Sequence, residues 1–155
     1  MSREGEVREF CQQCGTAVRT WQRPAVTVDM LIRYQGGIVL VYRRNDPINW
    51  ALPGGYVDYG ERLEDAARRE AREETNLELE DLEQFHVYSD PERDTRQHSV
   101  TTVFLAAGCG ELRAGDDAER VAIFTPSEAP HPLAFDHSRM VRDFADYLRE
   151  GRRPR

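Results

Sequence analysis

The segment from Glu61 to Thr75 constrains the fold most, because it reads as a helix and as little else. It is rich in Ala, Arg and Glu and contains no glycine or proline, which favours an α-helix. At 100° per residue, Leu63, Ala66, Ala67 and Ala71 share one arc of the helix surface. We therefore expect this face to pack closely against a neighbouring element.

Three glutamates, Glu70, Glu73 and Glu74, fall on the same arc as the alanines. Ionised carboxylates about 5 Å apart repel by roughly 3 kcal/mol per pair at an effective dielectric of about 20. A divalent cation reverses that penalty, and oxygen ligands favour magnesium, manganese or calcium over zinc. The alternative is an exposed acidic helix with i,i+4 pairs such as Arg69–Glu73.

A glycine loop before the helix argues against that alternative. In Leu52-Pro53-Gly54-Gly55 the glycines let the backbone approach a ligand closely. The spacing resembles the Nudix hydrolase signature: a glycine, glutamate after five residues, and Arg-Glu-hydrophobic-x-Glu-Glu-x-Gly-hydrophobic after seven more. The matching residues are Gly55, Glu61, Arg69, Glu70, Ala71, Glu73, Glu74, Asn76 and Leu77. The chief departure is Asn76, where the family has glycine, but asparagine tolerates the left-handed conformation next best.

The resemblance to the Nudix hydrolases implies a role for each matched position. The carboxylates of Glu70, Glu73 and Glu74 and the Gly54 carbonyl would bind Mg²⁺ or Mn²⁺. Arg69 would orient the carboxylates through ion pairs, and Glu61 would brace the loop that holds Gly55 against the helix. The general base stays open between two sets: Glu73 or Glu70 on the helix, and Asp116, Asp117 or Glu119 in a later segment.

The rest of the chain supplies the elements of an α/β fold. Alternating or apolar runs predict strands over 26–32, 38–42, 84–88, 100–107 and 121–124. Helical spacing predicts a last helix over 136–149, with Asp136 as its N-cap. We expect a Nudix-type α/β/α sandwich with a mixed sheet. Residues 1–22 would form a leader, residues 23–150 the Nudix domain and residues 151–155 a tail.

Charge and hydropathy exclude several partners. The net charge is −7 and all 21 basic residues are arginine, so we expect no nucleic-acid partner, because phosphate neutralisation needs a basic face. No apolar run approaches the roughly 20 residues of a membrane span. The polar start of the chain has no signal-peptide pattern, which predicts a cytoplasmic location. The family resemblance also makes a homodimer an expectation.

A second resemblance concerns the substrate. Residues 88–94, 114–118 and 133–137 are similar to segments of microbial ADP-ribose pyrophosphatases, which implies hydrolysis of ADP-ribose to AMP and ribose 5-phosphate. Arg43, Arg44 and Arg93 would then contact phosphate or ribose oxygens, and Phe104 or Tyr88 would stack on adenine. The plainer interpretation is that these are surface arginines and core aromatics. Alternative substrates are NADH, a dinucleoside polyphosphate or a nucleoside triphosphate, and another class is a non-catalytic nucleotide-sensing module.

The leader contains one cysteine pair, Cys11 and Cys14, in the order Cys-Gln-Gln-Cys-Gly. The pair is similar to one knuckle of a zinc ribbon, which some NADH pyrophosphatases carry before the Nudix domain. A structural zinc needs four ligands, whereas Cys109 and the four histidines lie far along the chain. Three interpretations remain open: an empty knuckle, a zinc site completed by other ligands such as those of a second subunit, and a redox pair.

Overall fold

The structure, a computed structural model, describes residues 6–21, 23–115 and 118–154. Its elements in chain order are β1 (Glu6–Phe10), β2 (Ala17–Trp21), β3 (Ala25–Tyr34), β4 (Gly37–Arg43), β5 (Trp50–Ala51), β6 (Gly54–Tyr56), α1 (Leu63–Thr75), β7 (Glu78–Tyr88), β8 (Ser99–Cys109), β9 (Ala118–Phe124) and α2 (His137–Glu150). Every strand and helix predicted for the main domain is present. All five predicted strands are longer than expected. In β7 and β9 the added residues include charged ones, which hide the apolar pattern.

The main sheet has seven strands and is mixed, as expected. Strand β3 lies at its centre and pairs in parallel with β8 and antiparallel with β4 and β6. The path through the sheet is β5-β4-β3-β8-β7, and β9 extends it beside β4. Because β6 pairs with β3 at Asp29↔Gly54, the glycine loop is fixed to the middle of the sheet.

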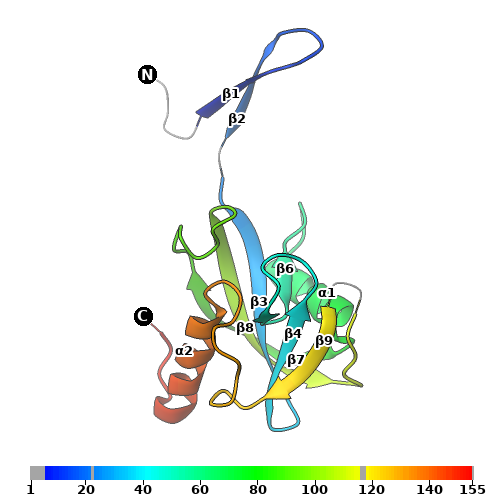
Figure 1. The fold of residues 1–155 in the computed structure, drawn as a ribbon, viewed down its shortest axis with the longest axis vertical. Helices are drawn as coiled ribbons and strands as arrows, with labels where there is room; N and C mark the ends of the chain where they lie inside the picture. The colour runs from blue at the N-terminus through cyan, green and yellow to red at the C-terminus, as the bar shows by residue number, and fades with distance from the viewer. Residues whose placement is uncertain (1–5, 22, 116–117, 155) are drawn as a thin grey trace.

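The two helices cover opposite faces of this sheet (Figure 1). The period of two along a strand separates the faces. Met30 and Phe104 belong to the core cluster that contains the alanines of α1. Their neighbours Leu31 and Val103 belong to the cluster that contains Phe144 of α2. The α/β/α sandwich is therefore confirmed, and within the described residues no helix is long and apolar enough to cross a membrane.

The end of α1 follows the prediction from the sequence, and the start of α2 follows it only in part. Asn76 ends α1 in the left-handed conformation, with φ of 60°, and its amide donates to the Arg72 carbonyl, as expected for a residue in the place of glycine. Asp136 is the N-cap residue of α2, but its side chain makes no capping hydrogen bond. Its carboxylate instead accepts hydrogen bonds from the Arg93 guanidinium. The Asp136 side chain therefore belongs to a buried ion pair and does not cap the helix.

The leader forms a two-stranded hairpin that the sequence analysis did not predict. Strands β1 and β2 pair antiparallel from Glu6↔Trp21 to Phe10↔Ala17. This pair is a sheet of its own, and Figure 1 shows it projecting beyond the start of β3. The short strands with interspersed charges give no clear alternation, which explains why the pattern was missed.

Candidate active site

The buried face of α1 brings a carboxylate to the glycine loop. Ala66, Ala67 and Ala71 are fully buried, so the helix lies close to the sheet. One turn further on, Glu74 is 9% exposed and its Oε2 accepts a hydrogen bond from the Gly54 amide at 2.9 Å. Burial raises the pKa of Glu74 to about 8, and the nearby Glu70 adds to this increase against the lowering effect of that amide.

The two loop glycines are required by close contacts rather than by turn geometry. A Cβ on Gly54 would lie 2.3 Å from the Val28 carbonyl oxygen. A Cβ on Gly55 would lie 2.4 Å from the Glu70 carboxylate. Side chains at these positions would push the loop from β3 or displace Glu70, so glycine lets backbone and carboxylates share one surface.

Arg69 joins the helix carboxylates to the loop. Its guanidinium donates to both Glu61 oxygens at 2.9 Å, to Glu70 at 2.6 Å and to Glu73 at 3.2 Å. Glu61 also accepts from the Asp58 amide, and these hydrogen bonds lower its pKa to about 2. These hydrogen bonds connect the loop to the helix, because Glu61 contacts both Asp58 and Arg69.

The oxygen donors of this site suit a hard divalent cation, but the three carboxylates do not converge on one point. Within the described residues, no three His, Cys, Asp or Glu side chains are arranged to hold a metal ion. Glu70 and Glu73 turn to Arg69, Glu73 is 58% exposed, and Glu74 is bonded to the loop. The burial that raises the pKa of Glu74 disfavours its charged form, and a cation would remove that penalty. Hard oxygen donors therefore fit magnesium or manganese here.

Glu70 and Glu74 line one end of a cleft, whereas Glu73 is not among its lining residues. The carboxylate end, about 260 Å³, is bounded by Asn45, Asp58 and Arg69 in addition to Glu70 and Glu74. A second pocket of about 100 Å³, the arginine end, adjoins it. Both pockets are lined by Arg43, Gly54, Gly55 and Tyr56. The glycine loop is therefore the floor on which the two ends meet.

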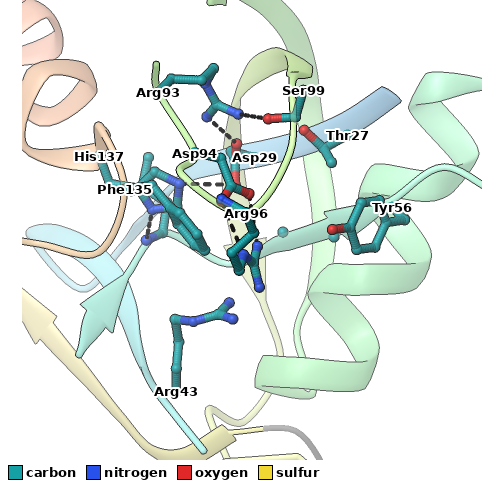
Figure 2. Close-up of a pocket in the computed structure, with 13 residues that line it drawn as sticks. Thr27, Asp29, Arg43, Tyr56, Arg93, Asp94, Arg96, Ser99, Phe135 and His137 are labelled. Atoms are coloured by element: carbon teal, nitrogen blue, oxygen red, sulfur yellow. Dashed lines mark hydrogen bonds and ion pairs between the residues drawn. The ribbon is translucent and has the colours of Figure 1, made fainter. Parts of the chain in front are cut away.

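Segments far apart in the sequence meet at the arginine end (Figure 2). Arg43 comes from the end of β4, Arg96 from the connection between β7 and β8, and Phe135 from just before α2. The two guanidinium carbons lie 4.9 and 4.8 Å from the Phe135 ring centroid. Burial and the charge of Arg96 lower the pKa of Arg43. Its guanidinium donates hydrogen bonds to the carbonyls of Pro47 and Asp46, which are neutral acceptors, so its charge is well placed for an anion.

A buried polar network supports the wall behind these residues. His137 accepts from the Leu52 amide through Nδ1 at 3.0 Å, which places its proton on Nε2, 3.4 Å from Asp29. Asp29 also accepts from Thr101 at 2.7 Å and lies 3.7 Å from Arg93. Burial holds the pKa of His137 below its ordinary value, against the raising effect of Asp29. The network thus ties the glycine loop, the sheet and α2 together.

The three arginines predicted to contact the substrate lie in three different environments. Arg43 lines both ends of the cleft. Arg93 lines the arginine end but is 8% exposed and bonded to Asp136 at 2.9 Å and Ser99 at 2.7 Å. Arg44 is exposed and is not among the lining residues. Arg43 remains the prediction that this geometry supports best.

The two predicted stacking aromatics lie in the core, which corrects that prediction. Tyr88 and Phe104 are each 3% exposed. Tyr88 packs against the α2 face and donates to Asp143 at 2.9 Å, whereas Phe104 packs against α1. Strand alternation directs each ring to a helix and away from the cleft, where Phe135 and Tyr56 are the lining aromatics.

The later acidic segment approaches the end of α1. The Gly115 amide donates to the Glu74 carbonyl at 3.0 Å, and a Cβ on Gly115 would clash with the Glu73 backbone. Glu119 is exposed near the start of β9. The other two base candidates, Asp116 and Asp117, lie outside the described residues. The choice of base therefore stays a prediction.

Sequence reasoning missed several residues of the arginine end: Thr27, Asp29, Tyr56, Asp94, Arg96, Phe135 and His137. They come from separate segments, and no spacing within one element connects them. One signal was available, since 88–94 and 133–137 were singled out by resemblance and both border this pocket. That signal located the segments without identifying the side chains.

The cysteine pair lies away from the cleft, at the turn of the leader hairpin. Cys11 is half-buried, Cys14 is exposed, and both are free thiols. No zinc site of three or more ligands occurs within the part of the chain that the structure describes. A zinc at this pair would need ligands from elsewhere.

Comparisons with known proteins point to one family. The NUDIX domain family model matches residues 21–144. An ADP-ribose pyrophosphatase of Methanocaldococcus jannaschii is 42% identical over 129 residues, covering 81% of this chain and 76% of that protein. The NUDIX domain of Shewanella oneidensis NrtR, solved with ADP-ribose, superimposes with a TM-score of 0.73 at 26% identity, covering 83% and 90% of the two chains.

A further solved structure contains a metal ion. A bifunctional NMN adenylyltransferase/ADP-ribose pyrophosphatase of Francisella tularensis, complexed with AMP and a manganese ion, matches with a TM-score of 0.70 at 27% identity. The match covers 84% of this chain and 42% of that one. With the family match, the relative and the carboxylate helix in agreement, the chain belongs to the Nudix hydrolase family.

Proposed function

We propose that the chain hydrolyses ADP-ribose to AMP and ribose 5-phosphate with Mg²⁺ or Mn²⁺. The observation that carries this proposal is that the two ends of the cleft share lining residues. Gly54 and Gly55 form a floor shared by a carboxylate end and an arginine end. A diphosphate lying across this floor would meet a metal site on one side and Arg43 on the other. The named relatives that act on or bind ADP-ribose support the substrate class.

The carboxylate end would hold the cation through Glu70, Glu73, Glu74 and the Gly54 carbonyl. A bound divalent ion neutralises the diphosphate, polarises phosphorus and lowers the pKa of an attacking water. Arg69 would position Glu70 and Glu73, because it already bonds both. Glu73 is the most exposed of the three carboxylates, which favours it over Glu70 and Glu74 as the group that takes the proton from water.

The arginine end would bind and orient the rest of the substrate. Arg43 reaches both pockets, so its guanidinium can contact the diphosphate where the two ends meet. The deeper wall carries Thr27, Asp94 and Ser99. These groups can pair with hydroxyls, which donate and accept hydrogen bonds, and this suits a ribose better than an apolar group.

A substrate panel with magnesium tests the proposal. The panel contains ADP-ribose, NADH, a dinucleoside polyphosphate and an oxidised nucleoside triphosphate, with products identified by chromatography. We expect AMP and ribose 5-phosphate from ADP-ribose, with kcat/KM about tenfold or more above the other compounds. A higher kcat/KM on another compound would refute the substrate assignment. Tight ADP-ribose binding without AMP release would instead indicate a sensing module.

A further inference from the structure

The turn of the leader hairpin gathers two thiols on a fixed backbone. The Gly15 amide donates to the Cys11 carbonyl at 2.8 Å, and the Cys11 amide donates to the Thr16 carbonyl at 2.9 Å. Gly15 has a φ of +68° with open space around it, so glycine is favoured there by backbone conformation. The Cys14 thiol lies 3.2 Å from the Thr16 hydroxyl. The turn therefore keeps both sulfurs near one tip.

The hairpin has little of its own to stabilise it. Strands β1 and β2 pair with each other in a separate sheet, and they project from the body of the molecule in Figure 1. Phe10, next to the turn, is 66% exposed. An isolated two-stranded hairpin is at best marginally stable in water. A ligand or partner bound at the tip would therefore stabilise the hairpin.

The chemistry of the tip suits a metal that prefers thiolates. Hydrogen bonds from Thr16 and Cys11 lower the pKa of Cys14, which favours the thiolate form that binds metal. A structural zinc is bound by four ligands. Within the described residues, no third thiol, imidazole or carboxylate completes a cluster with this pair, and Cys109 lies at the end of β8 in the body.

The residues at the hairpin tip carry no charge that would repel the same tip of a second copy. Residues 10–18 contain no charged side chain, in a chain that is 32% charged with a net charge of −7. Two tips could therefore meet although the two whole molecules repel each other. The exposed Phe10 of each copy would be covered in the same contact.

From these observations we propose that Cys11 and Cys14 of two copies bind one zinc ion between them. The four thiols would lose their protons to solvent on binding and give a closed tetrahedral site. The site would cross-link two chains through their hairpins and order the tips. This inference is independent of the proposed hydrolase function, because the hairpin does not line the cleft.

Zinc stoichiometry of the whole protein tests the proposal. The protein is purified under reducing conditions without chelator, supplied with zinc, and measured by elemental analysis and native mass spectrometry. We expect one zinc per two chains, carried by a dimeric species. The Cys11→Ser/Cys14→Ser variant should lose this zinc, whereas the matched Cys109→Ser variant should keep it.

Cobalt offers a second readout that does not depend on oligomer mass. Co²⁺ in place of zinc should give the thiolate-to-cobalt absorption of a four-thiolate tetrahedral site, absent in the Cys11→Ser/Cys14→Ser variant. Thermal unfolding of that variant checks that the body still folds. One zinc per single chain, no zinc under reducing conditions, or equal zinc in wild type and the double variant would each overturn the proposal.

Discussion

The two ends of the cleft differ in how the chain builds them, although they share one floor. At the carboxylate end, Glu70, Glu73 and Glu74 come from a single helix, and their i, i+3 and i+4 spacing places them together. At the arginine end, Arg43 and Phe135 come from segments that are adjacent only after folding. The first end is therefore readable from sequence, and the second depends on topology.

The difference extends to how each end is held. Arg69 bridges the helix carboxylates at part-exposed positions, so a cation can replace some of its contacts. Behind the arginine end, Asp29, Arg93 and His137 form a network that is nearly excluded from solvent. We infer that the carboxylate end rearranges on metal binding, whereas the wall of the arginine end stays fixed. The two ends should then respond differently to mutation.

The largest expected effect is at the carboxylate end. Glu74→Gln keeps the shape of the side chain and removes a charge that would bind metal. We expect kcat for ADP-ribose to fall about 10³-fold, the scale for losing a group that stabilises transition-state charge. Steady-state kinetics measures this, with the exposed Glu64→Gln on the same helix as control. Equal activity of Glu74→Gln and Glu64→Gln would contradict the metal assignment.

At the arginine end, the expected effect is on binding. Arg43→Gln removes a charged hydrogen-bond donor, worth about 2 kcal/mol, so KM for ADP-ribose should rise about 30-fold. We expect kcat to change by less than about threefold, because the group binds ground state and transition state alike. The neighbouring Arg44→Gln is the matched control and should change KM by less than about twofold. A fall in kcat alone for Arg43→Gln would show that the two ends do not divide the work in this way.

The two ends also differ in how they change the stability of the metal-free protein with pH. The pKa of Glu74 is raised from 4.5 to about 8 in the fold, so folded protein binds a proton that the unfolded chain has lost. Stability from this group is present at low pH and lost as pH rises towards 8. Burial lowers the pKa of His137 from its ordinary value of 6.5, so this group makes stability rise with pH only below pH 6.5. Between pH 6.5 and 8, Glu74 is therefore expected to dominate the change in stability.

In that window we expect the Tm of the metal-free protein to fall by about 5 °C, corresponding to about 2 kcal/mol. Calorimetry in chelator measures this change. Magnesium should reduce the slope, because a bound cation stabilises the charged carboxylate. The Glu74→Gln variant should show a flatter profile, and a slope equal to that of wild type would rule out Glu74 as its source.

The smallest expected effect tests the correction at Tyr88. Its ring belongs to the core cluster on the α2 face, and its hydroxyl donates to the partly exposed Asp143. Tyr88→Phe should therefore lower the free energy of unfolding by about 1 kcal/mol and leave KM for ADP-ribose unchanged. Urea unfolding and kinetics on the same sample give both quantities. A rise in KM with unchanged stability would return Tyr88 to the substrate site.

The sequence predicted the fold and one end of the cleft for a physical reason. Helical spacing joined Ala67, Ala71 and Glu74 on one face, and strand alternation separated the two faces of the sheet. Each of these patterns lies within a single element. The glycine loop was placed by its distance from the helix, and the contact between Gly54 and Glu74 agrees with that placement.

The arginine end and the hairpin were outside the reach of such patterns. Phe135 joins Arg43 and Arg96 only because α2 begins beside the end of β4 and the connection before β8 folds over both. Tyr88 and Phe104 were assigned to the site because aromatic residues can stack, but alternation along β7 and β8 directs them into the core. Composition identifies candidates for a contact, whereas packing decides which side chains are available.

Manganese binding by the full chain shows whether the carboxylate end is a metal site. Titration of the full chain with Mn²⁺, followed by electron paramagnetic resonance, counts the ions bound. We expect the wild type to bind Mn²⁺ and magnesium to displace it. Glu70→Gln, Glu73→Gln and Glu74→Gln should each weaken Mn²⁺ binding about tenfold or more, while Glu64→Gln binds normally. Equal manganese affinity in wild type and all three glutamine variants would contradict this expectation.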